Sequence, residues 1–153
     1  MLGLMQDAQL LTSATLAHAA RVYPGVEIAT ADDGQIVHRI TYAEADQRAR
    51  LLASSMERLG LTGEGVFVGA LAFNTWRLFE VMHGVPGAGG VLHTANPRLH
   101  ERHLTYTIRH TEDRAVLVDL DCLPLAEAIA PECPSVRHWI VMAGRHEMPA
   151  TTL

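Results

Sequence analysis

The stretch from Gly63 to Leu99 constrains the fold of this chain more than any other part of it. It begins with the most apolar run in the sequence, Val66 to Phe73, which leads to a helix start at Asn74. A glycine cluster then precedes a second apolar run, which Asn96-Pro97 closes. A continuous apolar run, unlike an alternating one, is typical of a strand buried on both faces. The stretch therefore predicts strand, helix, strand, the unit that builds a parallel sheet.

The second half of the chain continues this alternation of apolar runs and helical patterns. It predicts a helix over residues 100–110, a strand at Ala115–Asp119, a helix that Asp121 or Pro124 opens, and a last strand at Arg137–Met142. Such alternation is typical of an open α/β sheet with right-handed crossovers. We expect about five or six mostly parallel strands and five helices, with helices on both faces.

An antiparallel hairpin is predicted before this sheet. Val26–Ala31 and Gln35–Thr41 alternate as strands, and Asp33-Gly34 between them suits a type I′ turn, since both central residues must adopt positive φ. We expect the hairpin at the edge of the sheet. Thr41 and Glu44 then have the spacing of a capping box, and the helix that they begin ends at Gly60.

The two ends of the chain have weaker patterns. Residues 1–11 are expected to form a partly extended arm, after which Thr12 or Ser13 caps a first helix. Residues 143–153 become small and polar, as at a frayed end. A length of 153 residues suits one domain with an adequate core. We therefore treat residues 1–153 as a single, partial domain.

Charge and composition exclude several classes of function. The net charge of −5 argues against a nucleic-acid partner, which needs a clustered basic surface. All twelve cationic side chains are arginine, so a Walker lysine, a Schiff base and a catalytic lysine are absent from this sequence. No apolar run approaches the roughly 20 residues that span a bilayer. Cys122 and Cys133 are isolated thiols, typical of the cytoplasm.

Two clusters of residues could bind a ligand, but each has a simpler structural interpretation. The glycines follow a helix and precede a strand, whereas a phosphate-binding GxGxxG follows a strand and opens a helix. Close packing explains them better; they are Gly84, Gly87, Gly89 and Gly90. His100 and His103, with Glu101 and His110 nearby, have a spacing that a shared zinc could use, but no further ligands at convincing spacing follow. A solvated helix face is the better interpretation.

The remaining candidates are single groups near a predicted strand end. Asp119 and Asp121 could hold magnesium there, although Asp121 is better suited to capping the next helix. Cys122 has no neighbour that would lower its pKa, and it is interpreted as a core residue. The four serines lie outside any GxSxG context: Ser13, Ser54, Ser55 and Ser135. We therefore predict no catalytic, cofactor-binding or metal-binding residue in this chain.

Several ordered segments resemble the N-terminal region of acyl-CoA synthetases, the fatty-acid–CoA ligase branch of the adenylate-forming, AMP-binding enzymes. The nearest match is Val91–Leu99, VLHTANPRL. The others, in order, are GLMQD at 3–7, HRITYAE at 38–44, Leu59-Gly60, HTEDR at 110–114, AIAP at 128–131 and PSVRH at 134–138. The resemblance extends from about Gly3 to Pro149. Gly63-Glu64-Gly65 departs from it, since the family usually has Gly-Asp-Arg there.

The resemblance implies a parent enzyme that uses ATP and magnesium to make an acyl-adenylate and then transfers the acyl group to coenzyme A. Its phosphate loop and catalytic lysine would lie beyond the region resembled, so this chain is expected to bind no cofactor and to be inactive alone. The carboxylic acid would bind only in the full-length enzyme. Expected partners are the rest of that enzyme or a second copy. The alternatives are a stand-alone, non-catalytic α/β binding domain and a small nucleotide-handling enzyme of flavodoxin-like topology.

Overall fold

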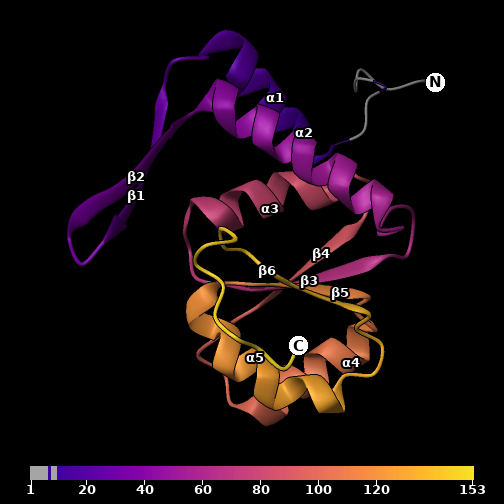
Figure 1. Cartoon of the computed structure of the whole chain (residues 1–153). Helices are drawn as coiled ribbons and strands as arrows, with labels where there is room; N and C mark the ends of the chain where they lie inside the picture. Colours follow the sequence, from indigo (N-terminus) through magenta and orange to yellow (C-terminus); the bar gives the residue numbers. More distant parts are fainter. Residues whose placement is uncertain (1–6, 8–9) are drawn as a thin grey trace.

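The computed structural model describes Asp7 and residues 10–153 of the chain. The predicted arm at residues 1–11 lies almost entirely outside these described residues. Figure 1 shows a central sheet with helices above and below it, and a hairpin that projects to one side. The elements are α1 (Thr12–Val22), β1 (Glu27–Asp32), β2 (Gln35–Thr41), α2 (Tyr42–Arg58), β3 (Phe67–Leu71), α3 (Trp76–Gly87), β4 (Val91–Ala95), α4 (Glu101–Thr111), β5 (Ala115–Val118), α5 (Leu123–Ile129) and β6 (His138–Val141), with 3₁₀ turns η1 (Leu120–Cys122) and η2 (Ala130–Glu132).

The predicted mostly parallel α/β sheet is confirmed. Its four strands are all parallel and lie in the order β4-β3-β5-β6. The strand predicted from the Val66–Phe73 run is β3, which lies between two neighbours and is buried from Val68 onward. The described residues contain six strands and five α-helices, in agreement with the expected number.

The antiparallel hairpin is also confirmed, but it forms a sheet of its own and does not extend the parallel one. Its turn residues Asp33 and Gly34 have φ values of +44° and +75°, as the type I′ turn requires. The hairpin is joined to the rest of the molecule through Thr30, whose hydroxyl accepts a hydrogen bond of 3.0 Å from the backbone N–H of Trp76.

Local sequence predicted one helix cap correctly and three wrongly. Thr41 and Glu44 form the capping box that begins α2. Asn74, however, does not cap α3: that helix begins at Trp76 after Thr75, and Thr30 from the hairpin supplies the acceptor for its first N–H. A distant strand has therefore replaced the local cap.

The other two corrections concern α1 and the turn after β5. Thr12 is the first residue of α1 and not its cap, because its hydroxyl donates to the carbonyl of Met82 on α3. Ser13 lies inside the same helix. Asp121 lies within η1 without a capping bond, whereas α5 begins at Leu123 with Pro124 in its first turn. In each case a tertiary contact or a tighter turn determined where the helix begins.

The two faces of the sheet are packed differently. One face is covered by α4 and α5 and contains Leu71, Val116 and Val118 among its buried residues. The other face is covered by α3, with α2 packed on α3, and contains Val68, Ala70 and Leu117. Residues 143–153 form no helix or strand, and Thr151 and Thr152 hydrogen-bond to Glu127 on α5.

Candidate functional site

The carboxyl edge of the sheet, between β3 and β5, is the place where the topology favours a ligand. β3 continues into α3 on one face, and β5 continues into η1 and α5 on the other. Neighbouring strands whose connections leave in opposite directions open a crevice at their carboxyl ends, and open α/β sheets bind ligands there. Asp119, which directly follows β5, lies at this switch point.

Asp119 is used in this structure to join the two strand ends. Its carboxylate accepts a hydrogen bond of 2.8 Å from the backbone N–H of Phe73, which follows β3. Burial raises the pKa of this carboxyl, and the hydrogen bond from Phe73 and the charge of Arg77 oppose the shift. Asp121 is exposed, and its negative charge adds to the raised pKa of Asp119. The pair therefore supports a structural role for Asp119.

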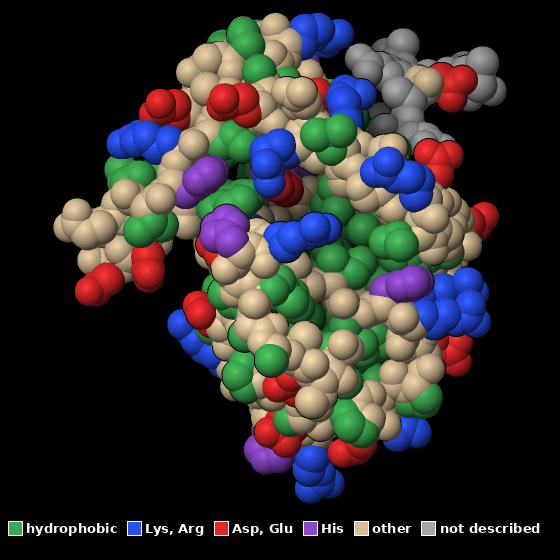
Figure 2. Space-filling view, in the orientation of Figure 1, with side chains coloured by type: hydrophobic (Ala, Val, Ile, Leu, Met, Phe, Trp, Pro, Cys, Tyr) green, Lys and Arg blue, Asp and Glu red, His purple; other side chains and the backbone are tan. Residues whose placement is uncertain are grey.

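A groove lies beside this edge, on the face that carries α3. We call it the α2–α3 groove; its volume is about 640 Å³, and its walls include Arg48 and Leu51 of α2 and Trp76 and Arg77 of α3. Its floor is the apolar side of β5 and β6 with the residue after β6, namely Leu117, Ile140 and Met142. Figure 2 shows hydrophobic side chains gathered across the middle of the visible face, with cationic side chains beside them.

Trp76 holds the charged side of the groove together. The guanidinium carbons of Arg48 and Arg77 lie 5.0 and 4.7 Å from its ring centroid, and His38 of the hairpin stacks on it at 4.4 Å. Each arginine also has an acidic partner: Arg48 bonds Glu80, and Arg77 lies 4.0 Å from Glu147. The groove is therefore apolar at its floor and electrically balanced at its rim.

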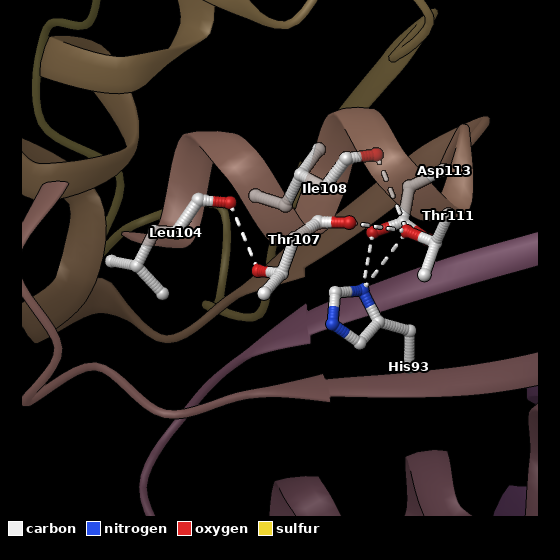
Figure 3. A network of polar contacts seen from close by, with 6 residues as sticks. All are labelled: His93, Leu104, Thr107, Ile108, Thr111 and Asp113. Carbon is white, nitrogen blue, oxygen red and sulfur yellow. Dashed lines mark hydrogen bonds and ion pairs between the residues drawn. The ribbon is translucent and has the colours of Figure 1, made fainter. Parts of the chain in front are cut away.

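A buried polar network on the opposite face was not predicted (Figure 3). The side chain of Asp113 is fully buried, and its two oxygens accept from Thr111 Oγ1 at 2.9 Å and contact His93 Nδ1 at 2.7 Å. A Cβ on Gly69 would lie 2.8 Å from the same carboxylate, so a glycine is needed there. The network connects β3, β4 and the end of α4, and Thr111 Oγ1 also lies 3.3 Å from His93 Nδ1. The one feature of the sequence that indicates this network is Thr111-Glu112-Asp113, a Thr-x-Asp pattern at the end of an amphipathic helix.

Of the glycine cluster, Gly84 has the close-packing role that the sequence favoured. Gly84 is buried inside α3, where a Cβ would lie 2.7 Å from Leu52 Cδ2 of α2. Gly87 is the last residue of α3, and Gly89 adopts a φ of +82° in the turn that follows. These positions let α3 approach α2 and return to the sheet.

The histidine pair of α4 lies on an exposed helix face. His100 caps α4 through its ring, since Nδ1 accepts from the N–H of Arg102 at 3.2 Å, and its centroid is 6.4 Å from that of His103. His110 stacks on Tyr106 of the same helix, with ring centroids 5.7 Å apart. Across Asp7 and residues 10–153, no group of three or more His, Cys, Asp or Glu side chains is arranged for a metal.

The candidate nucleophiles are not assembled into a site. Burial raises the pKa of Cys122 to about 11, so its thiol is protonated at neutral pH. Ser55 donates to the carbonyl of Leu51 one turn back, and Ser13 and Ser54 lie on helices. Ser135 has a buried hydroxyl without a partner, in the turn before β6.

The residues present do not fit an ATP–magnesium site. Phosphates need a glycine-rich loop that opens a helix, with a cation, and magnesium needs carboxylates. Here the glycines end a helix, the sequence contains no lysine, and Asp119 is engaged with Phe73. In the part of the chain that is described, no helix is long and apolar enough to cross a membrane.

Comparison with known proteins gives the family. The family model described as AMP-binding enzyme matches residues 16–151. A long-chain-fatty-acid–CoA ligase of Thermus thermophilus is 43% identical over 138 residues, which are 90% of this chain and 25% of the relative. A medium-chain-fatty-acid–CoA ligase of Ectopseudomonas oleovorans is 38% identical over 94% of this chain and 26% of the relative. The chain thus spans about a quarter of these curated relatives.

Solved structures agree on the fold. A fatty acyl CoA synthetase of Mycobacterium tuberculosis has a TM-score of 0.74 at 23% identity, over 84% of this chain and 26% of that one. The N-terminal domain of FACL13 from the same organism has a TM-score of 0.75 at 22% identity, over 92% of this chain and 37% of that domain. At these identities the structures show the fold alone. With the match over residues 16–151, the chain belongs to the AMP-binding enzyme family.

Proposed function

We propose that this chain is the N-terminal part of an ATP-dependent acyl-CoA ligase acting on a fatty or related carboxylic acid through an acyl-adenylate. The observation that carries the proposal is the 43% identity over 138 residues to a long-chain-fatty-acid–CoA ligase, of which these residues are 25%. Two further relatives at 37% and 38% identity carry names of CoA ligases for other acids. The shared chemistry is the ligation of a carboxylic acid to coenzyme A.

Within this enzyme the chain serves as scaffold, and by itself it is inactive. Acyl-adenylate formation needs a phosphate-binding loop and cations that stabilise developing charge. The candidate glycines follow or end α3 and do not open a helix after a strand, Gly84 is packed against α2, and lysine is absent. ATP, magnesium, coenzyme A and the acid are therefore bound by residues of the whole ligase. The two free, buried thiols support a cytoplasmic location.

The proposal is tested by two measurements. The purified chain should give no fatty-acid-dependent ATP–pyrophosphate exchange above an empty-vector control. Exchange above that control would contradict inactivity. A fusion in which this chain replaces the matching quarter of the Thermus thermophilus ligase should restore fatty-acid–CoA ligase activity. If the fusion is folded and inactive while the unaltered Thermus enzyme is active, the chain is not a ligase scaffold.

A further inference from the structure

The outer side of α4 has a hollow that shares no residue with the carboxyl edge of the sheet or with the α2–α3 groove. It lies between α4 and the turn η2 and has a volume of about 450 Å³, which is within the usual range for a small-molecule site. Its lining residues are Arg102, Thr105, Tyr106, Arg109, His110 and Glu132. Five of the six come from two turns of one helix, at spacings of three and four, so they share one face of α4.

Thr105 gives this hollow a buried polar group. The residue is only 6% exposed, and it lines the hollow. The other two threonines of α4, Thr107 and Thr111, donate to backbone carbonyls of the preceding turn. The hydroxyl of Thr105 makes no hydrogen bond to another described residue. Because buried polar groups are normally hydrogen-bonded, this hydroxyl is available to a ligand oxygen in the hollow.

Two arginines beside Thr105 supply positive charge that no acidic side chain neutralises. Arg102 and Arg109 have no carboxylate within 4 Å among the described residues, unlike the four arginines that form ion pairs, which are Arg39, Arg48, Arg50 and Arg77. Arg102 and Arg109 lie seven positions apart, about 10 Å along the helix axis, with Thr105 between them. Their long side chains can therefore reach one anion, and the planar guanidinium matches the oxygens of a phosphate.

The remaining lining residues select an organic phosphate over inorganic phosphate. Tyr106 is 65% exposed and stacks on His110 with an interplanar angle of 7°, which makes a flat platform for a planar ring. Glu132 is the one acid among the lining residues. Its carboxylate repels a bare phosphate but accepts hydrogen bonds from hydroxyl groups. The hollow is thus suited to a phosphate ester that also carries hydroxyl groups and a flat ring.

We propose that this hollow binds a nucleoside monophosphate, with the phosphate at Arg102, Thr105 and Arg109, the base on Tyr106 and the ribose hydroxyls at Glu132. A long polyanion is disfavoured by the net charge of −5, so the ligand is a small molecule. The inference goes beyond the proposed function and does not depend on it, because the hollow lies apart from the carboxyl edge and takes no part in acyl-adenylate formation.

The experiment titrates the purified chain by calorimetry with inosine monophosphate and with its parts: inosine, ribose phosphate and inorganic phosphate. We expect saturable binding of inosine monophosphate with a Kd below about 1 mM, and binding of each part that is weaker by about tenfold or more. Arg109→Gln should weaken binding of inosine monophosphate about tenfold through loss of the charged fork. Arg145→Gln, at an exposed position outside the hollow, is the matched control and should leave binding unchanged.

Glu132→Gln provides a second test, because it should weaken binding of inosine monophosphate while strengthening that of inorganic phosphate. Absence of saturable binding of inosine monophosphate overturns the inference. Equal losses in Arg109→Gln and Arg145→Gln also overturn it, because binding would then follow overall charge and not this hollow. Inorganic phosphate that binds as tightly as inosine monophosphate overturns the assignment to a nucleoside monophosphate. Chemical denaturation checks that each variant is folded, and if Arg109→Gln is not, Arg102→Gln at the other exposed arginine decides in its place.

Discussion

The two faces of the same four-stranded sheet differ in how fully helices cover them. The face under α4 and α5 encloses a full apolar cluster and a buried polar network around Asp113. The face under α3 encloses a cluster that includes Val68, Ala70 and Leu117, but the side chains of β6 are only half-buried beside the α2–α3 groove. Since the strands are the same, the difference comes from the number of helices on each side. A sheet can therefore have a fully covered core on one face and a groove beside the core on the other.

The largest expected difference between the faces concerns truncation of an apolar side chain. Leu104 of α4 is 0% exposed, so Leu104→Ala should lower the free energy of unfolding by about 2–5 kcal/mol through lost burial and a new cavity. Met142→Ala at the groove should cost less than about 1 kcal/mol, because its side chain already meets solvent. Chemical denaturation of both variants measures the difference, and equal losses would mean that the groove face is packed as tightly as the other.

A smaller loss is expected from the buried network. Asp113→Asn keeps the shape but replaces one carboxylate oxygen with a donor that faces either His93 or Thr111. The free energy of unfolding should fall by about 1–3 kcal/mol, the typical cost of an unmatched buried polar group. Asp121→Asn, at an exposed position, is the control and should stay within about 0.5 kcal/mol. Equal losses of stability in Asp113→Asn and Asp121→Asn would mean that the buried network does not stabilise this face.

The smallest effect is expected at the carboxyl edge, as a dependence on pH. Burial raises the pKa of Asp119, so between the unfolded and folded pKa values the folded state holds more protons. Stability from this group is then lost as pH rises, and Asp119→Asn should gain stability relative to the parent as pH rises through the acid range above the ordinary pKa of an aspartate. The measurement is a series of denaturation curves across this range.

Glu127 is expected to show the opposite dependence of stability on pH. Hydrogen bonds from Thr152 and Thr151 lower its pKa, so its contribution to stability is lost as pH falls. Glu127→Gln should therefore lose stability relative to the parent as pH rises over the same range. The same sign for both variants would show that titration at these two sites does not follow their contacts.

The strands and the parallel topology could be predicted because they depend on patterns within short segments. The Val66–Phe73 run predicted a buried strand, and β3 is one. The capping box at Thr41 and Glu44 and the turn at Asp33-Gly34 were likewise predicted, since their bonds form between residues at most three positions apart. The ordered motifs around Val91–Leu99 indicated the family, which the match over residues 16–151 shows.

The features that escaped prediction depend on residues far apart in the chain. The first N–H of α3 donates its hydrogen bond to the hydroxyl of Thr30, which lies 46 positions earlier in the chain, and not to Asn74. The carboxylate of Asp113, which precedes β5, contacts His93 of β4, 20 positions away and two strands across the sheet. No local pattern contains these partners, because a helix N–H can donate to any correctly placed acceptor, and a buried carboxylate can accept from any correctly placed donor.

The sequence by itself determined the alternation of strands and helices, the hairpin turn, the α2 cap and the absence of lysine, because each is a property of composition or of near neighbours. Only the tertiary structure decided that the hairpin stands apart from the sheet and that Gly84 is the glycine packed against α2. It also decided that one sheet face ends in an open apolar groove. These depend on how many helices fit over four strands and where they lie, which packing in three dimensions determines.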